Sequence, residues 1–358
     1  MINSKDNCPG ILIIGGYPPP YGGITVHIKR LHDYCKEENI KLKIITQFGA
    51  PHHPDVISLK GSKIFKLISL AYWIRSFKGK IIHIHSSRLS NLIWGGLLLH
   101  WAGRKKIRVI TNHSGNFSID TSNSLYNIIS KYVYKYFNYI ICLNKSQQAM
   151  FHKVLNIPMK RLPIIPSYIP MSTFRFNPSK KIEALNNNIH NKVKYLIVTT
   201  GYLEDYYGYE ILIKAVKKSN LDIGIVFIFY TASNLDYRKK LIHIINNNSN
   251  MWYVENILSD DMMYIIQNSS IFVRANFADT YGMVIGDAIQ LGIPVIASDI
   301  CPRHKGTILF ETGDADDLCN KIIDTINHLP YYRKQIKDIK NENNAGKLIE
   351  FYQSILED

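Results

Sequence analysis

Short apolar runs alternate with helical segments along the chain, and this alternation restricts the fold more than any other feature. In the first half the predicted strands are Ile11–Gly15, Lys41–Thr46, Ile81–His85, Val109–Asn112 and Tyr139–Leu143. The helices predicted between them are Gly22–Lys36, Lys63–Phe77, Leu89–Ala102 and Ser124–Tyr136. Strands that alternate with helices favour a parallel, doubly wound sheet with helices on both faces, which is an α/β fold.

The same alternation starts again in the second half, after a proline-rich stretch from Arg161 to Pro178 that reads as a linker. A chain of 358 residues is long for one domain and suits two. We therefore predict two similar open-sheet domains, residues 1–170 and 171–340, followed by a terminal helical segment, residues 341–358. Ligands of such sheets bind beyond the carboxyl ends of the strands.

Composition narrows the class of protein. With 46% hydrophobic residues the chain can bury full cores, and no apolar run reaches the roughly 18–20 residues of a membrane span. The N-terminal residues lack a signal-peptide pattern, and the five scattered cysteines form no Cys-x-x-Cys pair, so we expect a cytoplasmic protein. The net charge of +15 predicts attraction to nucleic acid, anionic lipid or phosphorylated substrates.

Two carboxylates in the segment from Arg274 to Asp299 point to a specific ligand. Asp279 precedes a Tyr281-Gly282 turn, and Asp287 lies eight positions later inside a predicted helix. The backbone N–H groups from Tyr281 onward are the unpaired donors of a helix N-terminus, which binds phosphate readily. A phosphate site between two acids suits a nucleotide-sugar, with one acid for sugar hydroxyls and one for ribose hydroxyls.

This segment resembles the paired-acid motif of retaining GT-B glycosyltransferases of family 4, although both acids are Asp where that family usually has Glu. The spacing and the continuation through Gly282, Ala288, Gly292, Pro294 and Val295 match. The resemblance implies two Rossmann-like domains facing a central cleft, with the 341–358 helix returning to the first domain. It also implies retaining transfer without a metal or other cofactor, with Asp279 on the sugar and Asp287 on the ribose.

Two features of the first half also match this family. Gly22 and Gly23 end a glycine-rich loop like the one that lies across the donor diphosphate; a simple tight turn is the alternative. His113 follows a strand at the position of the family's histidine near the donor sugar; a structural histidine is the alternative. His83 and His85 point to one face of a strand, but the sequence offers no third metal ligand, so packing is favoured.

The chain departs from the family pattern at two positions where the family has a cationic side chain. Tyr202 and Tyr207 stand where an Arg and a Lys that bind the diphosphate are expected. We expect Arg274, Arg303 and Lys305 to replace them, the alternative being that these three are surface charge. Asp314 and Asp316 resemble an Asp-x-Asp metal site, but their place at a predicted helix start favours capping.

The predicted function is transfer of a sugar from a nucleotide-sugar to a saccharide acceptor, expected to be lipid-linked, in cell-surface polysaccharide assembly. Amphipathic basic helices at Lys63–Lys80 and Tyr126–Phe137 fit either an anionic membrane surface, at the inner face of the plasma membrane, or a solvated helix face. One alternative is a GT-B-like binding protein with little or no activity. A nucleic-acid binder would explain the charge but not the paired acids, so no nucleic-acid partner is expected.

Overall fold

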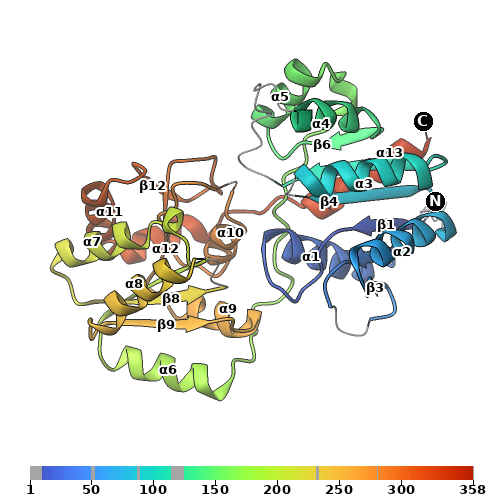
Figure 1. Ribbon diagram of the computed structural model, residues 1–358. Coiled ribbons are helices and arrows are strands. Elements are labelled where there is room, and N and C mark those ends of the chain that lie inside the picture. Colours follow the sequence, from blue (N-terminus) through green and yellow to red (C-terminus); the bar gives the residue numbers. More distant parts are fainter. Residues whose placement is uncertain are drawn as a thin grey trace, which may run out of the picture. The chain divides into compact units, whose positions relative to one another are not determined.

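The computed structural model describes residues 10–49, 53–86, 89–113, 125–230, 234–279 and 281–357. The chain divides into two compact units (Figure 1). The first unit contains the residues up to Ile169 together with those from Glu342 onward, and the second contains Pro170–Asn341. Each unit has its own sheet and its own hydrophobic cores.

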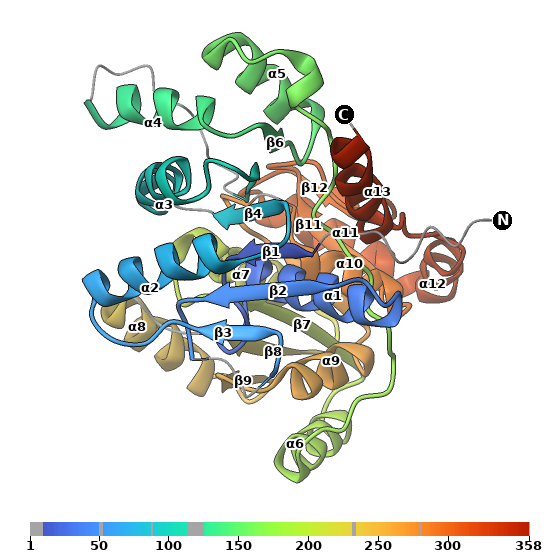
Figure 2. The same cartoon turned by 90° about the vertical axis from the view of Figure 1, so that its right-hand side faces the viewer.

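The first unit contains a six-stranded parallel sheet with the order β3-β2-β1-β4-β5-β6. Its strands are β1 (Ile11–Ile14), β2 (Leu42–Thr46), β3 (Val56–Ser58), β4 (Ile81–Ser86), β5 (Ile107–Asn112) and β6 (Tyr139–Ile141). Its helices are α1 (Gly23–Glu37), α2 (Lys63–Ser76), α3 (Leu89–Ala102), α4 (Leu125–Lys135), α5 (Lys145–Leu155) and α13 (Asn344–Glu357). Helices α2 to α5 cover one face of the sheet, and α1 and α13 cover the other (Figure 2).

The second unit repeats this architecture with the order β12-β11-β10-β7-β8-β9, again parallel throughout. Its strands are β7 (Tyr195–Gly201), β8 (Ile223–Phe229), β9 (Met251–Glu255), β10 (Ile271–Arg274), β11 (Val295–Ser298) and β12 (Ile308–Phe310). Its helices are α6 (Lys180–His190), α7 (Tyr209–Ser219), α8 (Leu235–Asn246), α9 (Ser259–Gln267), α10 (Met283–Gln290), α11 (Ala315–Asn327) and α12 (Leu329–Lys337). Helices α7, α8 and α11 cover one face, and α6, α9, α10 and α12 cover the other.

Both sheets have the strand order of a Rossmann fold, so the prediction of two doubly wound domains is confirmed. In each sheet the order reverses between two neighbouring strands, β1 and β4 in the first unit and β7 and β10 in the second. Parallel strands with this arrangement bind ligands outside the carboxyl ends at the point of reversal. Those two strand ends are therefore where functional side chains are expected.

Helix α13 is part of the core of the first unit, although it follows the whole second unit in the sequence. Leu348, Ile349 and the fully buried Tyr352 pack with α1 and the sheet. The side chain of Asn344 donates a hydrogen bond to the carbonyl oxygen of Tyr168, at 2.8 Å. The first unit is thus completed by two separate stretches of chain.

Within the described residues, no helix is long and apolar enough to cross a membrane.

Candidate active site

The point of strand reversal in the second unit contains the paired-acid segment. Strand β10 ends at Arg274, and α10 begins at Met283 after Gly282. Gly282 has φ +74°, a conformation that favours glycine, and a Cβ atom there would lie 3.1 Å from Nε of Arg274. The glycine therefore lets the backbone turn into α10 directly over the Arg274 side chain. The two ends of the motif, Asp279 and Asp287, lie before and within this helix.

Asp279 lies between two arginines. Its Oδ2 atom is 2.5 Å from Nε of Arg274 and 2.7 Å from Nη1 of Arg303. The side chains of these residues are only 8%, 9% and 2% exposed, in that order. Burial alone would raise the pKa of Asp279, but the two guanidinium groups outweigh it and hold that pKa well below its usual range. Two cations and one anion leave this buried group with a net charge of +1.

Arg303 also connects the motif to the end of the next strand. Its Nε donates to the carbonyl oxygen of Ser298 at 2.9 Å, and its Nη2 donates to the Ser298 hydroxyl at 3.0 Å. Both arginines are thus held in place by groups of the protein itself. Lys305, the third predicted cation, is exposed, and its carbonyl oxygen accepts a hydrogen bond from His304.

Asp287 lies in the middle of α10 and is 2% exposed. It is close enough to Tyr230 to raise the pKa of that phenol, although burial is the larger cause. A carboxylate this deeply buried must be satisfied by hydrogen bonds or by a ligand, because an unsatisfied charge is strongly unfavourable in a protein interior.

Aromatic side chains occupy the positions of the two missing cations. The rings of Tyr202 and Tyr207 lie 6.1 Å apart, and Tyr207 stacks on Tyr209 with 5.8 Å between ring centroids. The guanidinium carbon of Arg274 lies 5.5 Å from the centroid of Tyr207. The tyrosines therefore form one wall beside the Arg274–Asp279–Arg303 group.

In the first unit, Gly22 and Gly23 lie at the N-terminus of α1. Gly22 is the N-cap, and its N–H donates to the Thr25 hydroxyl at 2.9 Å. A Cβ atom at Gly23 would meet nothing within 4 Å, so the first turn of the helix is open on that side. Its first N–H groups are in the orientation that favours an anion.

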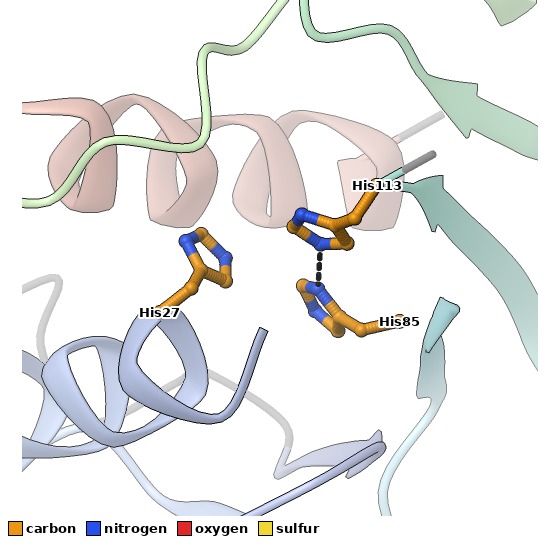
Figure 3. Close-up of side chains that lie close together, drawn as sticks. All are labelled: His27, His85 and His113. Atoms are coloured by element: carbon orange, nitrogen blue, oxygen red, sulfur yellow. Dashed lines mark hydrogen bonds between the residues drawn. The ribbon is translucent and has the colours of Figure 1, made fainter. Parts of the chain in front are cut away.

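Three histidines gather where the order of the first sheet reverses. His85 near the end of β4, His113 after β5 and His27 in α1 point their rings toward one another (Figure 3). Nδ1 of His85 and Nε2 of His113 form a hydrogen bond of 2.9 Å. The backbone N–H of His113 donates to the carbonyl oxygen of Ser86 at 2.8 Å, which fixes the end of β5 beside β4. The residues that follow His113, 114–124, lie outside the described part of the chain.

Comparisons with known proteins agree with this architecture. The family described as Glycosyltransferase Family 4 matches residues 21–172, and the family described as Glycosyl transferases group 1 matches residues 180–342. Each unit of the structure thus contains one of the two matched regions. No curated protein sequence matches the chain.

Solved structures with both domains are similar over the whole length. HepE from Anabaena, in complex with UDP-glucose, is 15% identical with a TM-score of 0.73, and the match covers 98% of both chains. Sucrose-phosphate synthase from Thermosynechococcus elongatus is 15% identical with a TM-score of 0.74, over 98% of this chain and 99% of that one. WaaG, a glycosyltransferase involved in lipopolysaccharide biosynthesis, is 11% identical with a TM-score of 0.70, over 96% and 99%.

This chain is a GT-B glycosyltransferase.

The structure also identifies candidate site residues of this glycosyltransferase that the sequence did not. His27 was not predicted, because nothing in its local sequence distinguishes it from other residues of an amphipathic helix. Asn276 lies between β10 and Asp279, and its buried side-chain Nδ2 has no hydrogen-bond acceptor in the described structure. The sequence signal for Asn276 is limited to its position, two residues after the end of β10 in the paired-acid segment.

The predicted helix start at Asp314 is present in this glycosyltransferase. Asp314 is the N-cap of α11, and its Oδ1 accepts from the backbone N–H groups of Asp316 and Asp317 at 2.7 and 3.1 Å. Asp316 forms an ion pair with Lys218 on the surface. The capping interpretation of this Asp-x-Asp sequence is confirmed.

Proposed function

We propose that this glycosyltransferase moves a sugar from a nucleotide-sugar to a lipid-linked saccharide acceptor with retention of configuration, as the resemblance to family 4 implies, in cell-surface polysaccharide assembly. The main support is the paired-acid segment, in which Asp279 and Asp287 lie on either side of the N-terminus of α10 at a point of strand reversal. HepE and WaaG support the donor class and the biosynthetic role by analogy, since the former binds UDP-glucose and the latter acts in lipopolysaccharide biosynthesis.

In this proposal the two acids bind different parts of the donor. Asp287 accepts hydrogen bonds from the ribose hydroxyls, and Asp279 accepts them from the sugar. The N–H groups at the start of α10 bind the diphosphate. Because Asp279 is held by Arg274 and Arg303, its carboxylate stays ionised and fixed in direction when the sugar arrives.

The net positive charge of the Arg274–Asp279–Arg303 group supports stabilisation of the leaving group. Cleavage of the sugar–phosphate bond leaves negative charge on the departing nucleoside diphosphate, and fixed positive charge is worth most when that charge develops. Burial strengthens the effect because water does not screen the guanidinium groups. Lys305 is the exposed cation that remains to contact the diphosphate from solvent.

Retention requires that the acceptor attacks on the face that the leaving group vacates. The departing phosphate oxygen then accepts the proton of the attacking hydroxyl, so the protein supplies no general base and no metal. His113 is assigned a contact with the sugar and its transition state. Its pKa is lowered well below the usual value by burial and by neighbouring histidines, so the ring is neutral and acts as a hydrogen-bonding group.

A lipid-linked acceptor is supported by a pocket in the first unit. The pocket has a volume of about 540 Å³ and lies beside α2 and the ends of β1 and β4. Its apolar lining includes Leu67, Leu70 and Leu99, and its polar lining includes Lys63 and Lys66. An apolar pocket with two lysines suits a hydrocarbon chain attached to a phosphate. His85 also lines this pocket, beside the histidine cluster.

Helices α2 and α3, which line the pocket, and α4, which packs against α3, present apolar side chains to solvent. Ile64 and Phe65 of α2 are 70% and 68% exposed, and Trp101 at the end of α3 and Tyr132 of α4 are also exposed. The same helices carry lysines and arginines, which are attracted to an anionic membrane surface. Peripheral binding at the cytoplasmic face would bring the pocket to a lipid-linked acceptor.

The proposed reaction is tested by incubating the purified protein with a panel of nucleotide-sugars, UDP-glucose first, and membrane lipid extract. Product analysis by mass spectrometry and NMR gives the sugar, the acceptor and the anomeric configuration. Asp287→Ala should lower the yield of product at limiting donor concentration, whereas Asp236→Asn, on the surface of α8, should leave it unchanged. An inverted product would refute the retaining assignment.

Membrane binding is tested separately with vesicles that contain anionic phospholipid. The double substitution Phe65→Ser and Ile64→Ser should reduce vesicle sedimentation, and Leu235→Ser, an equally exposed apolar side chain on α8, should not. Equal binding of all three proteins would argue against α2 as the docking surface.

The alternative function, a GT-B-like protein that binds a nucleotide-sugar without transferring it, is favoured by the tyrosines at 202 and 207. Calorimetric binding of UDP-sugars without product from any donor or acceptor would support it.

A further inference from the structure

The histidine cluster of the first unit has the composition of a metal site. One ring nitrogen from each of His27, His85 and His113 lies within 4.8 Å of the others. Two nitrogen ligands on a tetrahedral zinc ion are about 3.4 Å apart, given Zn–N bonds of about 2.0–2.1 Å. Small side-chain rotations therefore bring three nitrogens to one ion. Three histidines with one position left for water is a known zinc arrangement.

His27 is already oriented as a ligand. Its Nδ1 lies 2.6 Å from the carbonyl oxygen of Ser167, which only accepts hydrogen bonds, so Nδ1 carries the proton. The Nε2 atom then has a lone pair available for a ligand. A histidine whose second nitrogen donates to a backbone carbonyl is the usual arrangement at metal sites, because that hydrogen bond fixes both the tautomer and the ring direction.

His85 supplies an independent observation. Its Nδ1 is paired with His113, but its Nε2 is buried and has no hydrogen-bond partner among the described groups. The side chain is only 5% exposed, so water does not readily satisfy this nitrogen. A buried imidazole with an unused nitrogen, facing two others, is incompletely satisfied by the protein alone. A metal ion in the cluster would use the lone pairs gathered there.

The neighbouring His83 is not a fourth ligand. Its Nε2 is hydrogen-bonded to the Thr111 hydroxyl at 2.8 Å, and its Nδ1 is hydrogen-bonded to the Tyr352 hydroxyl of α13. Its ring lies against that of His85, with centroids 4.1 Å apart. His83 thus supports His85 from behind and restricts its rotation.

Binding of an ion would break the hydrogen bond between Nδ1 of His85 and Nε2 of His113, because one of these two nitrogens carries the shared proton. That proton would move to the other nitrogen of its ring, which leaves a lone pair for the metal.

We propose that His27, His85 and His113 form a binding site for a divalent transition-metal ion of the zinc type. Imidazole nitrogens select such ions over magnesium or calcium, which prefer oxygen ligands.

Calorimetric titration of chelator-treated protein with ZnCl₂ tests the proposal, with Co²⁺ absorption as a probe of coordination. One zinc ion per protein should bind, with the visible spectrum of tetrahedral Co²⁺. His27→Gln and His85→Gln should each weaken zinc binding by more than roughly 100-fold. Thermal unfolding of the metal-free variants checks that they are folded, and zinc affinities are compared among the folded variants only.

A second group, His32, His53 and Asp55, offers the matched control, since its potential ligand atoms also lie within 4.8 Å of one another. His53→Gln should leave zinc affinity and the cobalt spectrum unchanged. The proposal is overturned if the wild-type protein binds no zinc, or if His53→Gln abolishes binding while the folded His27 and His85 variants retain it. Since these measurements need no turnover, they decide the metal site even if no sugar transfer is found.

Discussion

The guanidinium group of Arg274 lies over the ring of Tyr207, with 5.5 Å between its central carbon and the ring centroid. Tyr207 occupies the position where the resemblance to family 4 leads us to expect a lysine. The tyrosine therefore does not supply a charge but holds one, because the negative face of an aromatic ring attracts a cation. The residue that stands in place of the expected lysine, Tyr207, therefore helps to position Arg274.

Replacing the ring tests this link. Tyr207→Leu should lower kcat/KM for sugar transfer by roughly 2–30-fold, the equivalent of about 0.5–2 kcal/mol for one cation–π contact. Tyr207→Phe keeps the aromatic face and should stay close to the wild type. A loss in Tyr207→Phe as large as in Tyr207→Leu would show that the hydroxyl group matters instead.

Asp279→Asn should destabilise the second unit by about 3–5 kcal/mol near neutral pH, because it leaves two buried guanidinium groups without their counter-ion. The pKa of Asp279 is depressed in the folded protein, so the unfolded chain binds more protons as the pH falls. The stabilisation is complete above the ordinary Asp pKa of about 3.9 and is lost below it. Denaturant unfolding between pH 7 and pH 3 should show the wild-type and variant stabilities converging only below about pH 4.

Asp287→Ala should weaken binding of the free nucleotide by about 1.5–3 kcal/mol, or roughly 10–150-fold, through loss of a charge-assisted hydrogen bond to the ribose. Calorimetry with UDP measures this directly. Because Asp287 is buried, the unfolding midpoint of the variant is measured alongside. Unchanged UDP affinity in a folded variant would remove Asp287 from the donor site.

Gly282→Ala should lower both stability and donor affinity. The residue has φ +74°, which costs an L-amino acid about 1–2 kcal/mol, and its new Cβ would press on Arg274. Gly292→Ala is the matched control, since φ there is +76° and a Cβ would meet nothing within 4 Å. Both variants should lose similar stability, whereas only Gly282→Ala should lose additional UDP affinity by calorimetry. Equal UDP affinities would mean that the contact with Arg274 has no part in donor binding.

Sugar transfer should persist in excess EDTA, because the proposed reaction uses helix N–H groups and guanidinium groups to stabilise the diphosphate. The measurement is the initial rate of product formation before and after chelation. A rate that falls to zero with EDTA and returns with Mg²⁺ or Mn²⁺ would overturn the metal-independent reaction.

The regular part of this fold is readable from the sequence because its signals are local. The start of helix α11 could be predicted at Asp314, since this aspartate caps the helix and the apolar residues that follow recur with helical spacing. Strand β3, in contrast, has three half-buried residues, Val56–Ser58, and gives no continuous apolar run. It was missed because its pairing with β2 is decided by the sheet and not by its own sequence.

The candidate site could be predicted only in part, because some of its contacts join residues that are far apart in the sequence. The acids at 279 and 287 were found because their spacing is a sequence property. That Arg274 and Arg303 both bind Asp279 was not found, since Arg303 reaches it only after the chain has passed through α10 and β11. Likewise His27 joins His85 and His113 only because α1 packs beside the ends of β4 and β5.

The position of α13 in the first unit has a consequence for how the protein is made. Residues 170–341 are one continuous polypeptide, so the second unit has all its sheet and core as soon as it leaves the ribosome. The first unit lacks Tyr352, which packs in its core and pairs with His83, until the second unit has been synthesised. The half of the protein that is translated first is therefore the last that can finish folding.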